Sequence, residues 1–298
     1  MKFIKKNFNF NKIKGNDEYN FPKNPDLPPK NGVFFSHLMI GTRGYGKTYS
    51  TLQFVDNFIH NYQKIYVISP TLQSDVKQKY KFRSLENTHK VQYFDEFNEE
   101  TINQILYDLN DDIETFKKYY KFKKIMKKYN IYGVDSLTDE ELQELLPYLV
   151  EDTDKLDMDF ILMAFPDYVK KDHPPMSYVF IDDAFGSKLL TNGRSSNFIN
   201  FYIKHRHLYC SISLLVQSIA YLPRAIRTNS VLFTVFPTKS KKDLKLLYEE
   251  TANVFPSEDD FHDAMKLVES EQYGFLFIDA SDTKNPDIRI SWDKQIEF

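Results

Sequence analysis

An octapeptide in the first fifth of the chain has the residue types and spacing of a phosphate-binding loop. Gly41-Thr42-Arg43-Gly44-Tyr45-Gly46-Lys47-Thr48 matches the pattern G-x-x-x-x-G-K-[ST]. Its glycines allow successive backbone amides to turn toward phosphate oxygens, and a helix that starts here adds the positive end of its dipole. We expect Lys47 to pair with the β and γ phosphates of ATP and the Thr48 hydroxyl to bind Mg2+. The alternative is a glycine-rich turn with an incidental lysine.

A pair of acids supplies the second half of such a site. Asp182-Asp183 follows the apolar run 178–181, as expected for a buried parallel strand that presents polar side chains at its carboxyl end. We expect Asp182 to hold Mg2+ through water and Asp183 to orient or deprotonate the attacking water. Related enzymes more often use Glu in the second role. Taken alone, the two acids could also be a solvated turn.

Hydrolysis in a motor needs further polar groups near the γ-phosphate. Gln217 ends the apolar segment 211–217 and could act as a sensor there, although it could also be an ordinary strand-end amide. Ring-forming motors add an arginine from a neighbouring subunit to offset transition-state charge. Each candidate could instead form a surface ion pair. The candidates are Arg194, Arg206, Arg224 and Arg227, of which we favour Arg206 and place Arg227 second.

Strands and helices must position these residues. Residues 33–40 read as a strand and 47–60 as a helix with one apolar face, so the glycine loop lies between a strand and a helix. Residues 64–69 form a short apolar strand that Pro70 stops. The remaining segments that we expect are strands at 91–94, 178–181, 211–217, 231–236 and 274–278, and helices at 196–205, 241–252 and 258–269.

The region from about 96 to 175 differs from the rest and reads as a charged helical insertion. Residues 99–129 are helical in pattern, and Ser136-Leu137-Thr138-Asp139-Glu140-Glu141 announces a second helix. The run 117–129 interleaves lysines with aromatics and could contact DNA phosphates. The alternative is a helix with a solvated basic face and an aromatic core face, paired with the acids of 135–159.

Composition limits the number of domains, the binding partners and the cellular compartment that we expect. With 298 residues and 42% hydrophobic content, the chain can bury one substantial core, so we expect an arm at 1–30 and one ATPase domain at 31–298. A net charge of −3 does not mark a general nucleic-acid binder. The lone Cys210 suits a buried thiol in a reducing compartment. His205 and His207 lack further ligands, so we expect no zinc site. We expect neither a membrane helix nor a secretory signal.

The order of these segments indicates a fold class. The metal-binding acid is not on the strand that follows the loop strand in sequence, because the strand 64–69 and the insertion intervene. This arrangement is typical of the additional-strand division of P-loop NTPases, which includes RecA-like motors. We therefore expect an α/β protein with a mainly parallel central sheet flanked by helices.

The ordered set of motifs resembles the poxvirus-type genome-packaging ATPases of the FtsK and HerA superfamily, found in large DNA viruses and their virophages. The resemblance covers about residues 33–236. Its features are the loop Gly41–Thr48, the strand that runs into Ser69-Pro70-Thr71, the pair Asp182-Asp183, and Arg206-His207 followed by a hydrophobic strand that ends in Gln217. The insertion at 96–175 and the use of Asp183 instead of Glu depart from the family pattern.

The resemblance implies an ATPase that forms a ring, a hexamer or a pentamer, and drives double-stranded DNA into a preformed capsid. Gln217 would be the sensor and Arg206 the finger, while ATP and Mg2+ would be the cofactors. Capsid or portal-vertex proteins would be partners, and the host cytoplasm, the viral factory or the virion the location. Three alternatives remain: a terminase-like or other DNA translocase or helicase, a small-molecule kinase, and a nucleotide-gated scaffold with little turnover.

Overall fold

A large, mostly parallel sheet forms the centre of the molecule. The computed structural model describes residues 19, 21–23, 28–42, 44–71, 76–150, 155–165, 171, 173–184, 186–191 and 196–297. In this part of the chain the sheet has nine strands, in the order β3-β2-β4-β5-β1-β6-β7-β8-β9. The strands are β1 (Ser36–Ile40), β2 (Lys64–Ile68), β3 (Lys90–Phe94), β4 (Ser177–Ile181), β5 (Cys210–Val216), β6 (Leu232–Val235), β7 (Leu276–Asp279), β8 (Asp287–Ile290) and β9 (Lys294–Gln295).

The six strands from β3 to β6 are all parallel, which confirms the predicted sheet. The inner strands β2, β4, β5 and β1, together with β6, are apolar and buried because helices cover both faces of the sheet, whereas the edge strand β3 is partly exposed. The strands β7, β8 and β9 add an antiparallel edge, and of these only β7 was predicted. Residues 287–290 alternate polar and apolar side chains, which is a strand signal that our prediction missed.

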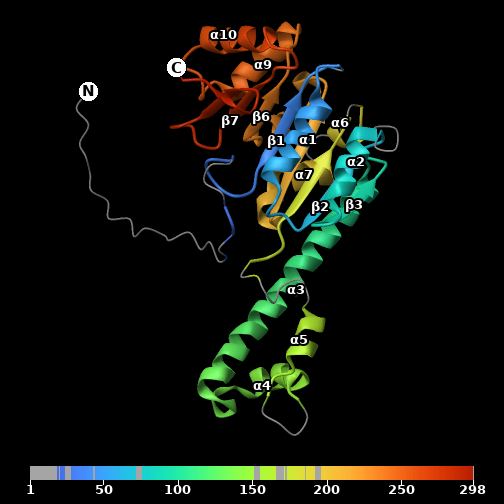
Figure 1. Ribbon diagram of the computed structural model, residues 1–298, viewed down its shortest axis with the longest axis vertical. Coiled ribbons are helices and arrows are strands. Elements are labelled where there is room, and N and C mark those ends of the chain that lie inside the picture. Colours follow the sequence, from blue (N-terminus) through green and yellow to red (C-terminus); the bar gives the residue numbers. More distant parts are fainter. Residues whose placement is uncertain are drawn as a thin grey trace, which may run out of the picture.

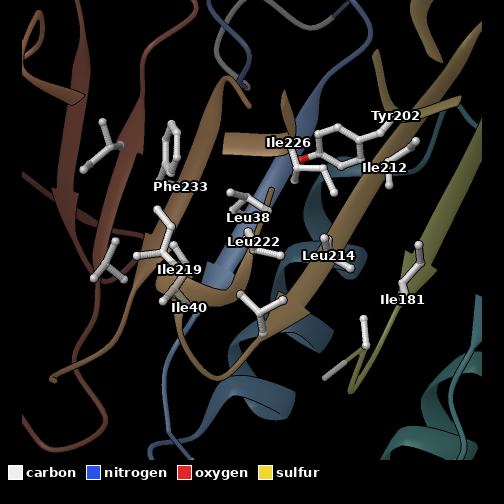
Figure 2. Packing of buried hydrophobic residues seen from close by; sticks show 14 of the residues in the cluster. Leu38, Ile40, Ile181, Tyr202, Ile212, Leu214, Ile219, Leu222, Ile226 and Phe233 are labelled. Carbon is white, nitrogen blue, oxygen red and sulfur yellow. The ribbon is translucent and has the colours of Figure 1, made fainter. Parts of the chain in front are cut away.

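Helices cover the two faces of the sheet, and alternate residues of β1 point into different cores. Met39 packs with residues of α1 (Lys47–Phe58) and α2 (Val76–Leu85). Leu38 and Ile40 point into the opposite core (Figure 2). That core also takes buried side chains from α6 (Lys188–Thr191), α7 (Asn197–Lys204), α8 (Arg224–Thr228), α9 (Lys241–Thr251), α10 (Glu258–Glu269) and the first half of α3 (Glu99–Tyr132).

The predicted insertion is a helical projection. Helix α3 leaves the sheet and extends well beyond it, with α4 (Asp139–Leu145) and α5 (Met158–Ala164) beside its far end (Figure 1). Phe116, Tyr119 and Phe122 of α3 are buried in a separate small core with residues of α4 and α5. The aromatic residues of the basic run therefore face a core, as the alternative interpretation of this segment expected.

Acids of α4 pair with lysines of α3, which is the pairing expected if the acidic and basic parts of the insertion attract each other. The Lys128 ammonium lies 2.6 Å from a carboxylate oxygen of Glu141. Lys121 makes the equivalent pair with Glu144. These charged groups are partly exposed and screened by solvent, so each pair contributes little to stability.

Local sequence signals determine where the helices of the projection begin and end. The Asn98 side chain accepts a hydrogen bond of 2.9 Å from the backbone of Thr101 and caps α3, which Gly133 ends at a φ of 78°. Thr138 and Glu141 form a reciprocal capping box at the start of α4, as their spacing predicts. An N-terminal cap of this kind stabilises its helix by about 1 kcal/mol.

Residues before the first strand also contact the body of the molecule. The ring of Tyr19 is buried and lies edge-on to Phe116 and Tyr209, with ring centroids 5.2 and 6.0 Å away. Phe21 packs against Phe34, with ring centroids 5.0 Å apart.

Cys210 is buried, as predicted for a structural thiol. Within the described ranges, we find no helix with the length and apolar character needed to span a bilayer.

Candidate nucleotide-binding site

A cavity of about 840 Å3 lies where the parallel strands end. It is lined by residues of the glycine loop, by both acids that follow β4 and by Gln217 after β5. Because the carboxyl ends of parallel strands share one edge of the sheet, residues distant in sequence meet there. The cavity thus brings together Lys47, Asp182, Asp183 and Gln217.

Close packing and positive φ angles shape the glycine loop. A Cβ atom on Gly41 would lie 2.6 Å from Cβ of Phe236, so no larger residue fits without a shift. Gly44 and Gly46 have φ angles of 89° and 86°, which glycine adopts without strain. The Lys47 ammonium donates to the carbonyl oxygen of Gly41 and, at 3.2 Å, to that of Thr42. The Lys47 side chain therefore lies over the glycine loop in which it is predicted to bind phosphate.

Three predicted members of the loop, Arg43, Tyr45 and Thr48, contribute no described side chain to the cavity. Arg43 lies outside the described residues, and so does the side chain of Thr48, although its backbone belongs to the first turn of α1. Tyr45 is exposed and does not line this cavity.

The acid pair and Gln217 come into direct contact. The Asp182 amide donates to the carbonyl oxygen of Ile68 at 2.9 Å, which ties the residue to the end of the neighbouring β2. Asp183 has a φ of 50°, in the left-handed region that is uncommon for residues other than glycine. The Gln217 amide nitrogen lies 3.4 Å from a carboxylate oxygen of Asp183, a long hydrogen bond. The turn after β4 thus directs Asp183 toward Gln217.

The order of the strands around this site shows which class of fold the chain has. The loop follows β1 and the acids follow β4, and β5 pairs with both strands and lies between them. The additional strand expected from the sequence is therefore present, and Gln217 follows it. A glycine loop joins β1 to α1, which begins at Lys47 directly after Gly46. The chain has the fold of a P-loop NTPase.

Solved structures with a similar chain path include nucleotide complexes of a viral genome packaging NTPase and of a conjugation coupling protein. The genome packaging NTPase B204 of Sulfolobus turreted icosahedral virus 2, in complex with AMP, is 14% identical, with a TM-score of 0.45 over 87% of this chain and 98% of that one. The pCW3 conjugation coupling protein TcpA with ATPγS is 11% identical, with a TM-score of 0.41 over 89% of this chain and 60% of that one.

A third similar structure is the cytoplasmic domain of the type VII secretion ATPase EccC of Thermomonospora curvata. It is 13% identical, with a TM-score of 0.42 over 87% of this chain and 25% of that one. No protein-family model and no curated protein matches the sequence. Likeness at this level concerns the path of the backbone and does not extend to activity or substrate.

None of the described candidate arginines lines the cavity of its own chain. Arg206 is exposed just before β5, at the opposite edge of the sheet from the glycine loop. Arg227 is in α8, and its Nε atom lies 3.1 Å from a carboxylate oxygen of Glu250, with both side chains largely buried. Arg224 is exposed in the same helix, and Arg194 is outside the described residues. Of these, Arg206 is the exposed candidate next to the strand that leads to Gln217.

The two histidines beside Arg206 differ in burial. His205 is buried, and its Nδ1 atom lies 2.6 Å from the carbonyl oxygen of Cys210. Burial is the main cause that lowers the pKa of His205 to about 4, so its ring is neutral at neutral pH. His207 is exposed. His205 thus holds the turn that presents Arg206.

Six further residues line the cavity that sequence patterns did not single out as site residues: Tyr49, Leu52, Thr71, Leu215, Val216 and Tyr273. Thr71 had a signal, because it follows the strand that Pro70 stops. Its hydroxyl lies 3.3 Å from that of Ser69. Tyr49 and Leu52 belong to α1. Tyr273 had no signal in the sequence, because it comes from the turn before β7 and contacts the glycine loop only in the folded chain.

Proposed function

We propose that this protein is an ATP-hydrolysing motor that translocates double-stranded DNA into a viral capsid. The observation that carries the ATPase part is the meeting of Lys47, Asp182, Asp183 and Gln217 in one cavity at the carboxyl edge of the sheet. Phosphoryl transfer needs little covalent chemistry from the protein, so positioned charges and a positioned water account for most of the catalysis. This set of side chains fits that requirement.

Each residue has a role that follows from its chemistry. The loop amides and Lys47 would hold the β and γ phosphates and balance their negative charge. The Asp183 carboxylate would accept a proton from the attacking water, and the Gln217 amide beside it would hold that water in line. The contact of 3.4 Å between these two side chains supports a joint role.

The oxygen donors of the site also fit Mg2+. Asp182 follows β4 and lines the same cavity as Lys47, and a carboxylate with a hydroxyl is a donor set that Mg2+ prefers. Asp182 and Thr48 would hold the ion, which supplies charge neutralisation between the β and γ phosphates when it is bound.

The motif order supports the DNA-packaging part of the proposal. The loop, the Ser69-Pro70-Thr71 segment, the acid pair and the Arg206-to-Gln217 segment occur in the order typical of poxvirus-type packaging ATPases. The chain would assemble into a homo-oligomeric ring that contacts capsid or portal-vertex proteins. In such a ring Arg206 would reach the site of a neighbouring subunit, with Arg227 as the second candidate.

A steady-state ATPase assay with and without duplex DNA tests the proposal. We expect Mg2+-dependent hydrolysis that linear duplex DNA stimulates at moderate salt, and turnover at background in Lys47→Ala. Tyr107→Ala is a matched control, because Tyr107 is an exposed residue of α3 that does not line the cavity. Hydrolysis without DNA stimulation would contradict the translocase. Binding of ATP with negligible turnover would favour a nucleotide-gated scaffold instead.

A further inference from the structure

A second cavity adjoins the glycine loop on the side away from the acid pair. It measures about 400 Å3, and Gly44 and Tyr45 form one wall while Pro237 and Tyr273 form part of the other. Gly44 and Tyr273 also line the main cavity. The glycine loop and Tyr273 therefore border both cavities.

The strand order gives the direction in which a bound nucleotide extends. Asp182, Asp183 and Gln217 follow β4 and β5, which lie on one side of β1. In the proposed site these residues act at the γ-phosphate. The α-phosphate and the nucleoside must then leave the loop in the other direction, toward β6 and β7. The second cavity lies on that side.

The backbone holds Tyr273 against the loop. Tyr273 has a φ of 59°, and the turn that carries it is closed by a hydrogen bond of 3.2 Å from the Gly274 amide to the Glu271 carbonyl. A Cβ atom on Gly46 would lie 3.3 Å from the Tyr273 ring. The residue is still 59% exposed. Its ring thus contacts the loop while much of it is open to a ligand.

We propose that Tyr273 binds the base of the nucleotide by stacking, and that the second cavity is the nucleoside site. This inference rests on the proposed ATPase function. An exposed aromatic ring that borders a phosphate site offers a flat apolar surface to a purine, and such stacking is sequence-tolerant and strong. Thr238, Lys239, Glu269 and Glu271 also line the cavity, and Glu271 is paired with Lys294. The Glu269 carboxylate can only accept hydrogen bonds, which suits a base with an exocyclic amino group such as adenine.

Calorimetric titration with two ligands tests this site. ATP carries a base and inorganic tripolyphosphate does not, and both would bind the glycine loop. We expect Tyr273→Ala to weaken ATP binding by about tenfold or more, the usual effect of losing one stacked aromatic ring. Tripolyphosphate affinity should stay within about twofold, because stacking does not act on a ligand without a base. Tyr273→Phe keeps the ring and should bind ATP as the wild type does.

The outcomes are distinguishable. Equal losses for ATP and tripolyphosphate in Tyr273→Ala would mean that the ring only supports Gly46, and would overturn the base site. Unchanged ATP affinity in Tyr273→Ala, or wild-type affinity in Tyr273→Leu, would overturn it as well. Lys47→Ala should weaken both ligands. A wild-type chain that binds neither ligand would overturn the proposed ATPase function and, with it, the base site.

Discussion

At the scale of single residues, the most informative feature is the backbone of Asp183. Left-handed conformations at residues other than glycine cost about 1 kcal/mol or more and cluster at functional sites. Here the conformation accompanies the contact between the Asp183 carboxylate and the Gln217 amide. Aspartate tolerates this region better than most residues, because its short side chain can bond locally. The same requirement makes Asn the best matched substitution at this position.

We expect Asp183→Asn to lower the rate of ATP hydrolysis by about 100-fold or more, since a general base contributes 10² to 10⁴. ATP affinity should change little, because asparagine keeps the size and the left-handed preference. Single-turnover hydrolysis and calorimetric binding separate the two effects. Loss of ATP binding in step with turnover would mean that Asp183 only maintains the shape of the site.

Two buried histidines predict how the free energy of unfolding depends on pH. His37 lies in the sheet with its Nε2 atom 2.8 Å from the Thr234 hydroxyl, and burial lowers its pKa to about 3. The pKa of His205 is lowered to about 4 for the same main reason. An unfolded histidine has a pKa of about 6.5. The unfolded chain therefore takes up protons below this pH that the folded chain does not bind, and stability falls as the pH falls.

Between about pH 6.5 and 5 we expect the free energy of unfolding to decrease by up to about 1.4 kcal/mol per pH unit for each of these histidines. Above pH 7 their contribution should be constant. Urea unfolding across this range measures the slope. The variant His37→Gln removes one of the two titrating groups. It should therefore reduce the slope by about 1.4 kcal/mol per pH unit, whatever the absolute stability of the variant. A slope equal to that of the wild type would contradict the assignment of His37.

At the scale of elements, α3 joins two structural units. Its first half packs into the main core through Ile102, Ile105 and Leu109, and its second half belongs to the separate aromatic core of the projection. The helix is 34 residues long, so it extends about 50 Å at 1.5 Å per residue. A rigid element of this length can carry a surface far from the nucleotide site.

The lysines of α3 that face solvent are candidates for contact with DNA phosphates. Lys117, Lys118 and Lys127 are exposed. Of the other exposed lysines in this run, Lys121 is paired with Glu144, and the Lys124 ammonium lies 4.5 Å from the centroid of the Tyr120 ring. We expect replacement of Lys117, Lys118 and Lys127 by alanine to weaken DNA stimulation and leave basal ATPase activity unchanged. The salt dependence of DNA binding should flatten by about 0.9 in log–log slope for each lost phosphate contact.

Lys121→Ala is the matched control for this experiment, because it removes a lysine from the same helix that already has an acidic partner. We expect it to have the smaller effect on DNA stimulation. A triple variant with the DNA response of the wild type would leave the projection without a role in DNA binding. A capsid-protein contact would then be the next hypothesis for it.

At the scale of the whole molecule, the nucleotide cavity and Arg206 lie at opposite edges of one sheet. The cavity is where the parallel strands end, and Arg206 lies where β5 begins. A single subunit cannot bring these groups together, but a head-to-tail contact between subunits can, and repeated contacts of this kind close into rings. The arrangement suits a site that two neighbouring subunits share.

Mixing two inactive variants tests this shared site. Lys47→Ala should lack phosphate binding in its own cavity, and Arg206→Ala should lack the group offered to its neighbour. Random co-assembly in equal amounts would leave about a quarter of the interfaces with both residues intact, if each interface is formed by one Lys47 and one Arg206. We therefore expect ATPase activity to reappear when the two variants are co-assembled. Continued inactivity in mixed rings would mean that Arg206 acts elsewhere, and Arg227→Ala would be mixed next.

Local residue patterns were enough to predict much of this protein. The glycine loop, the strand before it and the helix after it are encoded in one contiguous segment of the chain. The acid pair directly follows the strand that positions it. The capping box at Thr138 was readable for the same reason, because its two partners are neighbours in the chain. Short-range steric and hydrogen-bonding preferences decide such features.

Only the tertiary structure decided which distant residues meet. Gln217 contacts Asp183 because β5 pairs with β4, and Tyr273 reaches the glycine loop because the turn before β7 folds over it. The aromatic residues of the basic run on α3 face a core, while its lysines turn outward or pair with α4. These outcomes depend on sheet pairing and on burial against other elements. Neither is encoded within any one segment, so local patterns could offer the contact of Gln217 and the core face of the basic run only as alternatives, and gave no sign of the position of Tyr273.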